Sequence, residues 1–192
     1  MEQLLKRAVQ QEKLQVLGYE ERALTVKEFE QFEALLQTQW KPCQRKLEAF
    51  RAAKEPWELE RMRKAQQITD QAFSELLAVI QPGITEKQLA AELIYRLYKF
   101  GGEMLSFDPI VVSGPNTSMP HGVPGDRMLQ KGDFVTMDFG CKYQGYCSDM
   151  TRTVALGSVT EQMREVYETV ARAQLAGIAA TKAEKQGKEI DA

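Results

Sequence analysis

Apolar residues recur at helical spacing over four stretches of this chain. The stretches are residues 25–36, 56–81, 85–100 and 158–175. In each, apolar positions return every three or four residues, as they do on one face of an α-helix. Three stretches open with a Ser or Thr followed three residues later by Glu or Gln, a capping box that marks a helix start. The boxes begin at Thr25, Thr85 and Ser158. We therefore predict four amphipathic helices whose apolar faces contact a core.

Between the third and fourth helices, the pattern indicates β-structure. Residues 109–112 predict a short strand, and residues 134–140 and 146–154 predict longer ones. Residues 141–145 lie between the two longer strands and predict a turn, so these strands should form a hairpin. Residues 113–126 are rich in Gly, Pro, Asn and Ser and predict a loop. Helices around one β-rich segment favour an α+β fold.

Two aspartates occupy strand positions, where aspartate is uncommon. They are Asp138 and Asp149. A two-residue loop at Tyr143 and Gln144 would place the two directly opposite each other, as would a four-residue loop with that centre. A loop of three or five residues would send the side chains to opposite faces. Directly opposed like charges repel, and two divalent cations about 3.5–4 Å apart would turn that repulsion into attraction. Spacing alone leaves an equal alternative, in which one aspartate caps a turn and the other is solvated.

The single histidine, His121, lies in the predicted loop just upstream of this hairpin. Imidazole titrates near neutral pH and can donate, accept or ligate. A lone histidine is more often structural than catalytic, but the nearby carboxylates favour a functional role. Thr151 follows Asp149 by two residues and so shares its face of the strand. Its hydroxyl is a candidate hydrogen-bond donor that supports the metal ligands.

Four blocks of this segment, in this order and spacing, resemble the pita-bread metallopeptidases. The blocks are residues 107–116, 120–122, 131–140 and 145–153. The resemblance is strongest to the branch of Xaa-Pro aminopeptidase and Xaa-Pro dipeptidase (prolidase), and it runs from about Arg51 to the C-terminus. It implies the N-terminal half of a pita-bread (creatinase/aminopeptidase-like) catalytic domain. A weaker similarity over part of residues 1–50 implies a remnant of a creatinase-like N-terminal domain.

The resemblance also implies a role for each candidate residue. Asp138 matches a carboxylate that chelates one metal ion, and Asp149 matches a carboxylate that bridges two. His121 matches the histidine that hydrogen-bonds the substrate or the tetrahedral intermediate. The two divalent ions would be manganese or cobalt, and the sequence does not choose between them. The implied reaction is hydrolysis of the peptide bond before proline, in peptides with proline at the second position.

The ligand set implied by the resemblance is larger than this chain provides. One further histidine and two further glutamates are expected, and the chain has one histidine in all. We therefore expect residues 54–192 to be the first half of the catalytic domain. Residues 1–53 would be the remnant domain with a linker helix. Such a chain should bind metal poorly and be weakly active or inactive, and part of an apolar helix face should stay uncovered.

Composition and charge bear on the binding partners and the cellular location of the protein. A net charge of −2 gives no sign of nucleic-acid or membrane affinity. No apolar run reaches the length of a membrane span, and the N-terminus lacks the apolar region of a signal peptide. Three cysteines without a disulfide framework favour a reducing compartment. These features predict a cytoplasmic protein.

Two other functions remain as alternatives. Pita-bread folds also serve as non-catalytic binding modules, and the creatinase branch hydrolyses a non-peptide C–N bond without metals. The presence of Asp138, Asp149 and His121 argues against both. Methionine aminopeptidase shares the fold, but residues 113–116 and 147–153 favour the proline branch. Enzymes of this family are often dimers, so a homodimer is one expected assembly.

Overall fold

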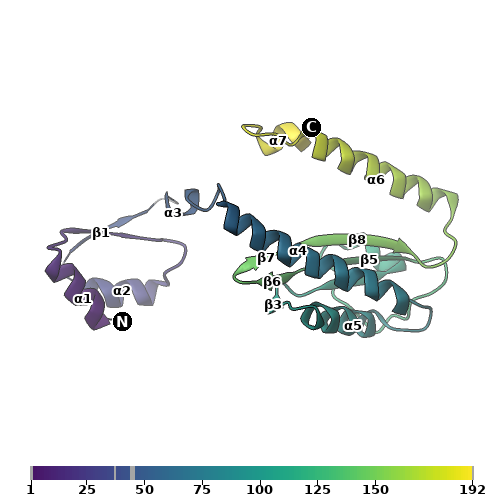
Figure 1. The fold of residues 1–192 in the computed structure, drawn as a ribbon, viewed down its shortest axis with the longest axis horizontal. Helices are drawn as coiled ribbons and strands as arrows, with labels where there is room; N and C mark the ends of the chain where they lie inside the picture. The colour runs from purple at the N-terminus through teal and green to yellow at the C-terminus, as the bar shows by residue number, and fades with distance from the viewer. Residues whose placement is uncertain (1, 37, 44–45, 192) are drawn as a thin grey trace. The chain divides into compact units, whose positions relative to one another are not determined.

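The computed structural model describes residues 2–36, 38–43 and 46–191. These residues divide into two compact units, Met1–Pro56 and Trp57–Ala192. Figure 1 labels most of the helices and strands of the two units.

The N-terminal unit combines helices with a pair of short strands. Its elements are α1 (Glu2–Gln11), β1 (Val16–Tyr19), α2 (Val26–Leu35), β2 (Gln39–Pro42) and α3 (Lys46–Ala49). The two strands pair in parallel, and α2 is the crossover between them. Thr25 and Glu28 form the predicted capping box of α2, which is confirmed. The rings of Tyr19, Phe29 and Trp40 pack together with centroids 4.7 to 6.4 Å apart.

The larger unit places two antiparallel sheets among its helices. Its helices are α4 (Pro56–Leu76), the 3-10 turn η1 (Leu77–Val79), α5 (Glu86–Lys99), η2 (Gly114–Ser118), α6 (Glu161–Ala180) and α7 (Gly187–Asp191). Its strands are β3 (Met104–Leu105), β4 (Ile110–Ser113), β5 (Phe134–Phe139), β6 (Cys141–Tyr143), β7 (Tyr146–Cys147) and β8 (Met150–Ala155). Among the described residues the sheet orders are β4-β5-β8 and β3-β6-β7. The predicted α+β class is confirmed.

The core of this unit lies between the β4-β5-β8 sheet and helices α4 and α5 (Figure 1). Along β5, buried residues alternate with half-buried ones, as the period of a strand requires. Val135, Met137 and Phe139 are fully buried and belong to one apolar cluster with Ile68 of α4 and Leu93 of α5. The opposite face of β5 therefore carries its half-buried residues, and Asp138 is one of them.

The hairpin turns at a different place from the one predicted. Tyr143 pairs with Tyr146, so the two-residue loop is Gln144 and Gly145, and the predicted loop at Tyr143 and Gln144 is wrong. Gln144 has φ 46° and Gly145 has φ 85°. A hairpin turn with positive φ at both central positions favours glycine at the second of them. The predicted centre would have forced the tyrosine into that conformation instead.

This turn moves the register of the hairpin by two residues. Asp138 lies opposite Thr151 and not opposite Asp149, so that pairing was also wrong. Because the shift is an even number, Asp149 stays on the same side of the hairpin, as the diagonal neighbour of Asp138. Diagonal neighbours are roughly 7–8 Å apart. Asp149 falls between β7 and β8, and the shared register of the flanking ladders places it opposite Gly140.

Helix α6 differs from its prediction in two ways. Its N-cap is Thr160, whose hydroxyl accepts from the Met163 amide, and not Ser158. The apolar stripe of α6 is not a core face, because α6 buries none of its residues within the described chain; it is an uncovered apolar helix face of the kind that the sequence led us to expect. Apart from a ring contact between Tyr167 and Phe134, most of its large apolar side chains are exposed. They include Val166, Val170, Leu175 and Ile178 at 58 to 65% exposure. Across the described ranges, no helix has the length and apolar content needed to cross a membrane.

Candidate metal centre

Three of the predicted site residues line one open pocket of the larger unit. They are His121, Asp138 and Asp149, and the pocket has a volume of ≈ 520 Å³. Its other lining residues are Phe107, Asp108, Pro109, Ile110, Gly122, Val123 and Pro124. The structure therefore brings together a loop, a central strand and the break in a hairpin. It leaves their chemical roles as predictions.

Asp138 has an unusual environment for a carboxylate. It lies on the central strand, between Ile110 of β4 and Thr151 of β8. Its Oδ1 atom is buried and has no hydrogen-bond partner in the described part of the chain. Burying a charged oxygen without a partner is costly, and such groups in folded proteins call for an explanation, such as an ion. A cation in the pocket would supply the missing partner.

Asp149 is exposed, but the backbone that carries it is anchored. The preceding Ser148 is buried, and its hydroxyl lies 2.6 Å from the hydroxyl of Thr69 in α4. The same hydroxyl accepts from the amide of Cys141 at 2.9 Å. Ser106 donates its hydroxyl to the Ser148 carbonyl at 2.7 Å. These contacts anchor the backbone at Ser148, directly before Asp149. The Asp149 carboxylate therefore reaches the pocket from an anchored backbone.

His121 belongs to a loop that packs closely on the sheet. The residue is exposed, whereas the following Gly122 is buried. The Gly122 amide donates to the Met119 carbonyl at 3.1 Å. A Cβ atom at Gly122 would lie 2.7 Å from a methyl of Val112, so only glycine fits without a shift. The close approach holds the backbone next to His121 against β4.

Thr151 lies where the strand period places it, opposite Asp138 and exposed. In the described ranges its hydroxyl makes no hydrogen bond to Asp138 or Asp149. Its supporting role therefore stays a prediction.

The residues present fit part of a divalent-metal site. Carboxylate oxygens suit manganese and similar ions, and the unpartnered Oδ1 of Asp138 is available to one. Within the described chain, however, no group of three or more His, Cys, Asp or Glu side chains is arranged to hold a metal. Octahedral ions need about six ligands. Asp138 and Asp149 can therefore provide only a share of the coordination.

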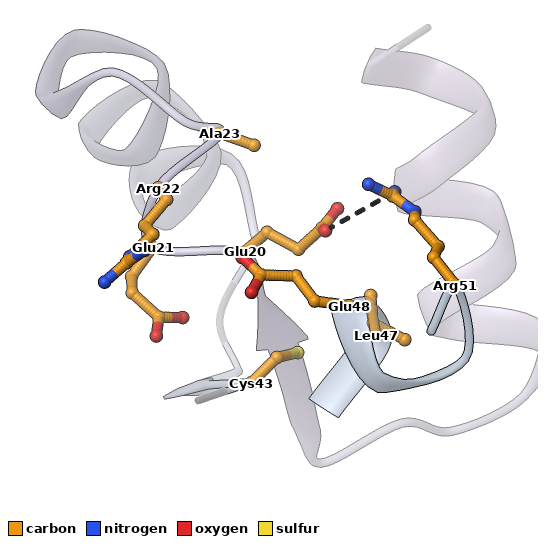
Figure 2. A pocket seen from close by; sticks show the side chains of 8 residues that line it. All are labelled: Glu20, Glu21, Arg22, Ala23, Cys43, Leu47, Glu48 and Arg51. Carbon is orange, nitrogen blue, oxygen red and sulfur yellow. Dashed lines mark ion pairs between the residues drawn. The ribbon is translucent and has the colours of Figure 1, made fainter. Parts of the chain in front are cut away.

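A second pocket lies in the N-terminal unit and holds none of the predicted site residues. Its volume is ≈ 220 Å³. Figure 2 shows its lining, which is Glu20, Glu21, Arg22, Ala23, Cys43, Leu47, Glu48 and Arg51. Arg51 and Glu20 form an ion pair at 3.9 Å, and both are well exposed. Exposed pairs of this kind contribute little, so the chemistry of the chain is better placed in the pocket with Asp138.

Two acidic residues next to the loop of His121 are buried, and the sequence pattern did not predict this. Glu86 is 0% exposed and Asp133 is 9% exposed. Glu86 lies inside the capping box that begins at Thr85, and Asp133 follows Lys131 and Gly132 in a pattern typical of a turn. No local signal separates either from a solvated residue, because acidic residues are common in the first turn of a helix and in turns. Asp108 also lines the pocket. It directly precedes Pro109, where an aspartate is typical of a turn cap and gives no sign of a site.

Removing the unpartnered carboxylate should stabilise the metal-free protein. We expect Asp138→Val to raise the free energy of unfolding in EDTA by about 1 kcal/mol, since valine suits a half-buried strand position. Unfolding in urea with EDTA present measures this difference in the free energy of unfolding. The variant should also lose any stabilisation by Mn²⁺, which depends on binding to the folded state.

The matched control is Thr136→Val, on the same face of β5. Its hydroxyl lies 3.0 Å from that of Thr153, so this change should lower stability by about 0.5–1 kcal/mol. A loss of stability for Asp138→Val in EDTA would show that the carboxylate has a partner without metal.

Known proteins match this chain along most of its length. The model of metallopeptidase family M24 matches residues 60–192. The Bacillus subtilis protein named "Uncharacterized peptidase YqhT" is 40% identical over 177 residues, which cover 92% of this chain and 50% of that protein.

Two solved structures are also similar over 99% of this chain and 54% of theirs. The Xaa-Pro dipeptidase from Bacillus anthracis has a TM-score of 0.95 at 36% identity. The X-Pro aminopeptidase from Thermotoga maritima has a TM-score of 0.93 at 32% identity. The chain spans about half the length of these relatives, and the resemblance to pita-bread metallopeptidases is confirmed. This chain belongs to metallopeptidase family M24.

Proposed function

We propose that this chain carries part of the active site of a metal-dependent exopeptidase that hydrolyses the peptide bond before proline. One observation carries the proposal. His121, Asp138 and Asp149 line one pocket, and a buried carboxylate oxygen of Asp138 lacks a hydrogen-bond partner in the described chain. The similar structures from Bacillus anthracis and Thermotoga maritima are named as an Xaa-Pro dipeptidase and an X-Pro aminopeptidase, which supports this substrate class.

Each residue of the pocket has a proposed role. Asp138 and Asp149 would hold divalent cations, manganese or cobalt, which when bound polarise a carbonyl group and provide a nucleophile at neutral pH. His121 would hydrogen-bond the substrate oxygen on which charge develops. Thr151 would support the carboxylates. The apolar side chains of the lining, such as Val123, would limit water around the scissile bond.

The chain by itself would be a weak enzyme or an inactive one. Its two aspartates leave most of a two-metal coordination shell unfilled, and it contains one histidine. Since metal affinity depends on ligand number, such a site binds poorly. We propose residues 1–53 as a remnant of an N-terminal domain with a linker helix, and residues 54–192 as the first half of the catalytic domain. A cytoplasmic location and a homodimer also remain predictions.

A chimera tests this function directly. In it, this chain replaces the matching half of the Bacillus anthracis Xaa-Pro dipeptidase, to which it is 36% identical. With Mn²⁺ the chimera should hydrolyse Xaa-Pro dipeptides or Xaa-Pro-Yaa tripeptides. Asp149→Ala in the same chimera should lower kcat/KM by at least about 10³-fold, since it removes a metal ligand.

The unfused chain is measured beside the chimera and should show weak turnover or none. Xaa-Ala peptides serve as the substrate control. A folded chimera that binds Mn²⁺ and cleaves Xaa-Ala as fast as Xaa-Pro would contradict the proposed specificity. Efficient turnover by the unfused chain, abolished by Asp149→Ala, would contradict the incomplete site.

A further inference from the structure

A carboxylate buried at the start of α5 has no part in the metal centre. Glu86 is 0% exposed and receives four hydrogen bonds from the described residues. Its Oε1 accepts from the Ser113 amide at 2.7 Å, the Ser113 hydroxyl at 2.8 Å and the Asn116 side chain at 3.1 Å. Its Oε2 accepts from the Gly125 amide at 3.0 Å. A single side chain thus joins three points of another segment.

Those points enclose the loop that carries His121. Ser113 ends β4, and Asn116 lies in η2, which follows it. Gly125 lies at the other end of the loop, where the chain again contacts the start of α5. The backbone of α5 adds a further tie, since the Lys87 amide donates to the Gly125 carbonyl at 3.1 Å. The two ends of the loop are therefore held together at the N-terminus of one helix.

Helix capping does not explain this carboxylate. Thr85 already caps α5, with its hydroxyl accepting from the Gln88 amide and the Gln88 side chain accepting from the Thr85 amide. A first-turn glutamate that served only the helix dipole could stay in water. Burying its charge is unfavourable unless hydrogen bonds compensate. Here all four hydrogen bonds come from the loop, and the charge of Arg127 adds a favourable interaction.

The neighbouring groups fix the direction of these hydrogen bonds. Arg127 donates to the Ser113 hydroxyl at 2.6 Å, so the Ser113 proton is free to point at Glu86. Every contact uses Glu86 as an acceptor, and a carboxylate accepts on both oxygens. A glutamine would present an NH₂ group to at least one of these donors.

We propose that Glu86 is a positioning residue whose buried carboxylate closes the loop of residues 113–125 and so holds His121 in the pocket beside Asp138 and Asp149. The role of His121 rests on the proposed function. The closure of the loop by Glu86 does not, because it follows from hydrogen bonds that involve neither metal nor substrate.

The test compares Glu86→Gln with the wild type in the full chain, without metal or peptide. Amide hydrogen exchange at Ser113 and Gly125 should become about 10- to 100-fold faster, as expected for lost hydrogen bonds to a charged acceptor. The imidazole signal of His121, the single histidine, should broaden or split in a carbon–proton NMR spectrum. Exchange in α4 and β5 should stay as in the wild type.

Leu93→Ala is the matched control, since Leu93 is a 0% exposed residue of the same helix, and its core cluster includes no residue of the loop. It should lower protection throughout the unit and not selectively at the loop. The proposal is overturned if Glu86→Gln leaves the loop amides and His121 unchanged, or if it acts throughout the unit as Leu93→Ala does.

Asn116→Ala keeps the proposal testable if Glu86→Gln does not fold. It removes one donor and should loosen the same loop by about tenfold or less; an unchanged loop would overturn the proposal. In the chimera, Glu86→Gln should lower kcat with Mn²⁺ affinity retained, and Glu86→Asp should not restore kcat, because it is too short. A loosened loop together with an inactive parent chimera would sink the proposed function alone.

Discussion

Gly140→Ala is expected to destabilise the larger unit by roughly 3 kcal/mol or more, as overpacking against backbone does. An added Cβ atom would overlap the carbonyl oxygen of Ser148 and lie 2.7 Å from its carbonyl carbon. A third neighbour, the Ser106 hydroxyl, would be 3.1 Å away. The nearest atoms belong to the backbone, so no rotation of a side chain can relieve the clash.

The same change should also disturb the metal centre. Ser148 directly precedes Asp149, and its carbonyl is held by the Ser106 hydroxyl. Moving that carbonyl away from position 140 would break this bond and displace the Asp149 carboxylate. We therefore expect Mn²⁺ to stabilise the wild type more than Gly140→Ala, even at temperatures where the variant is folded.

Urea unfolding of Gly140→Ala beside Gly177→Ala measures the effect. Gly177 lies in α6, and an added Cβ there meets nothing within 4 Å. Alanine at that position should raise stability by about 0.5–1 kcal/mol, because glycine is unfavourable inside a helix. A variant at position 140 as stable as the wild type would mean that the strands separate there at little cost.

Local chemistry allowed the helices to be predicted from the sequence. The capping boxes at Thr25 and Thr85 are confirmed, because each depends on residues three positions apart. The predicted box at Ser158 is wrong, since Thr160 offers a competing hydroxyl two residues later. The two hydroxyls lie two residues apart, and the local pattern does not show which of them caps the helix.

The predicted pairing of Asp138 with Asp149 was wrong, but the predicted face of the hairpin for both residues was right. The turn centres on Gln144 and Gly145 because both central positions have positive φ, which glycine adopts more readily than the tyrosine of the predicted turn. The two aspartates still share a face, since an even shift preserves the period of a strand. The unpartnered oxygen of Asp138 and the contacts of Glu86 were beyond prediction, because they depend on segments far apart in the sequence.

Asp133→Asn is the second change with a large expected effect. Asp133 is 9% exposed and accepts from Arg127 at 2.6 and 3.0 Å and from the Gln130 amide at 2.8 Å. Asparagine removes the charge and leaves the guanidinium without its ionic partner. We expect a loss of about 2–3 kcal/mol in the free energy of unfolding at pH 7, measured in urea. Asp126→Asn is the control, because its pair with Lys87 is exposed and should contribute less than about 1 kcal/mol.

The effect of Asp133 should depend on pH in a defined direction. Burial alone would raise the pKa of Asp133, but the hydrogen bonds from Arg127 and Gln130 and the charge of Arg127 lower it below 3.8. Since the folded pKa lies below the unfolded one, the stabilisation is fully present above the unfolded value. It is lost as the pH falls through the folded pKa.

The stability of the wild type should therefore fall more steeply than that of Asp133→Asn below about pH 4. The two curves should converge in acid, and parallel curves would show that the carboxylate gains nothing from its partners. Arg127 also donates to Ser113, which donates to Glu86. Protonation of Asp133 should thus loosen the loop of His121 before the unit unfolds, and faster exchange at the Gly125 amide would report it.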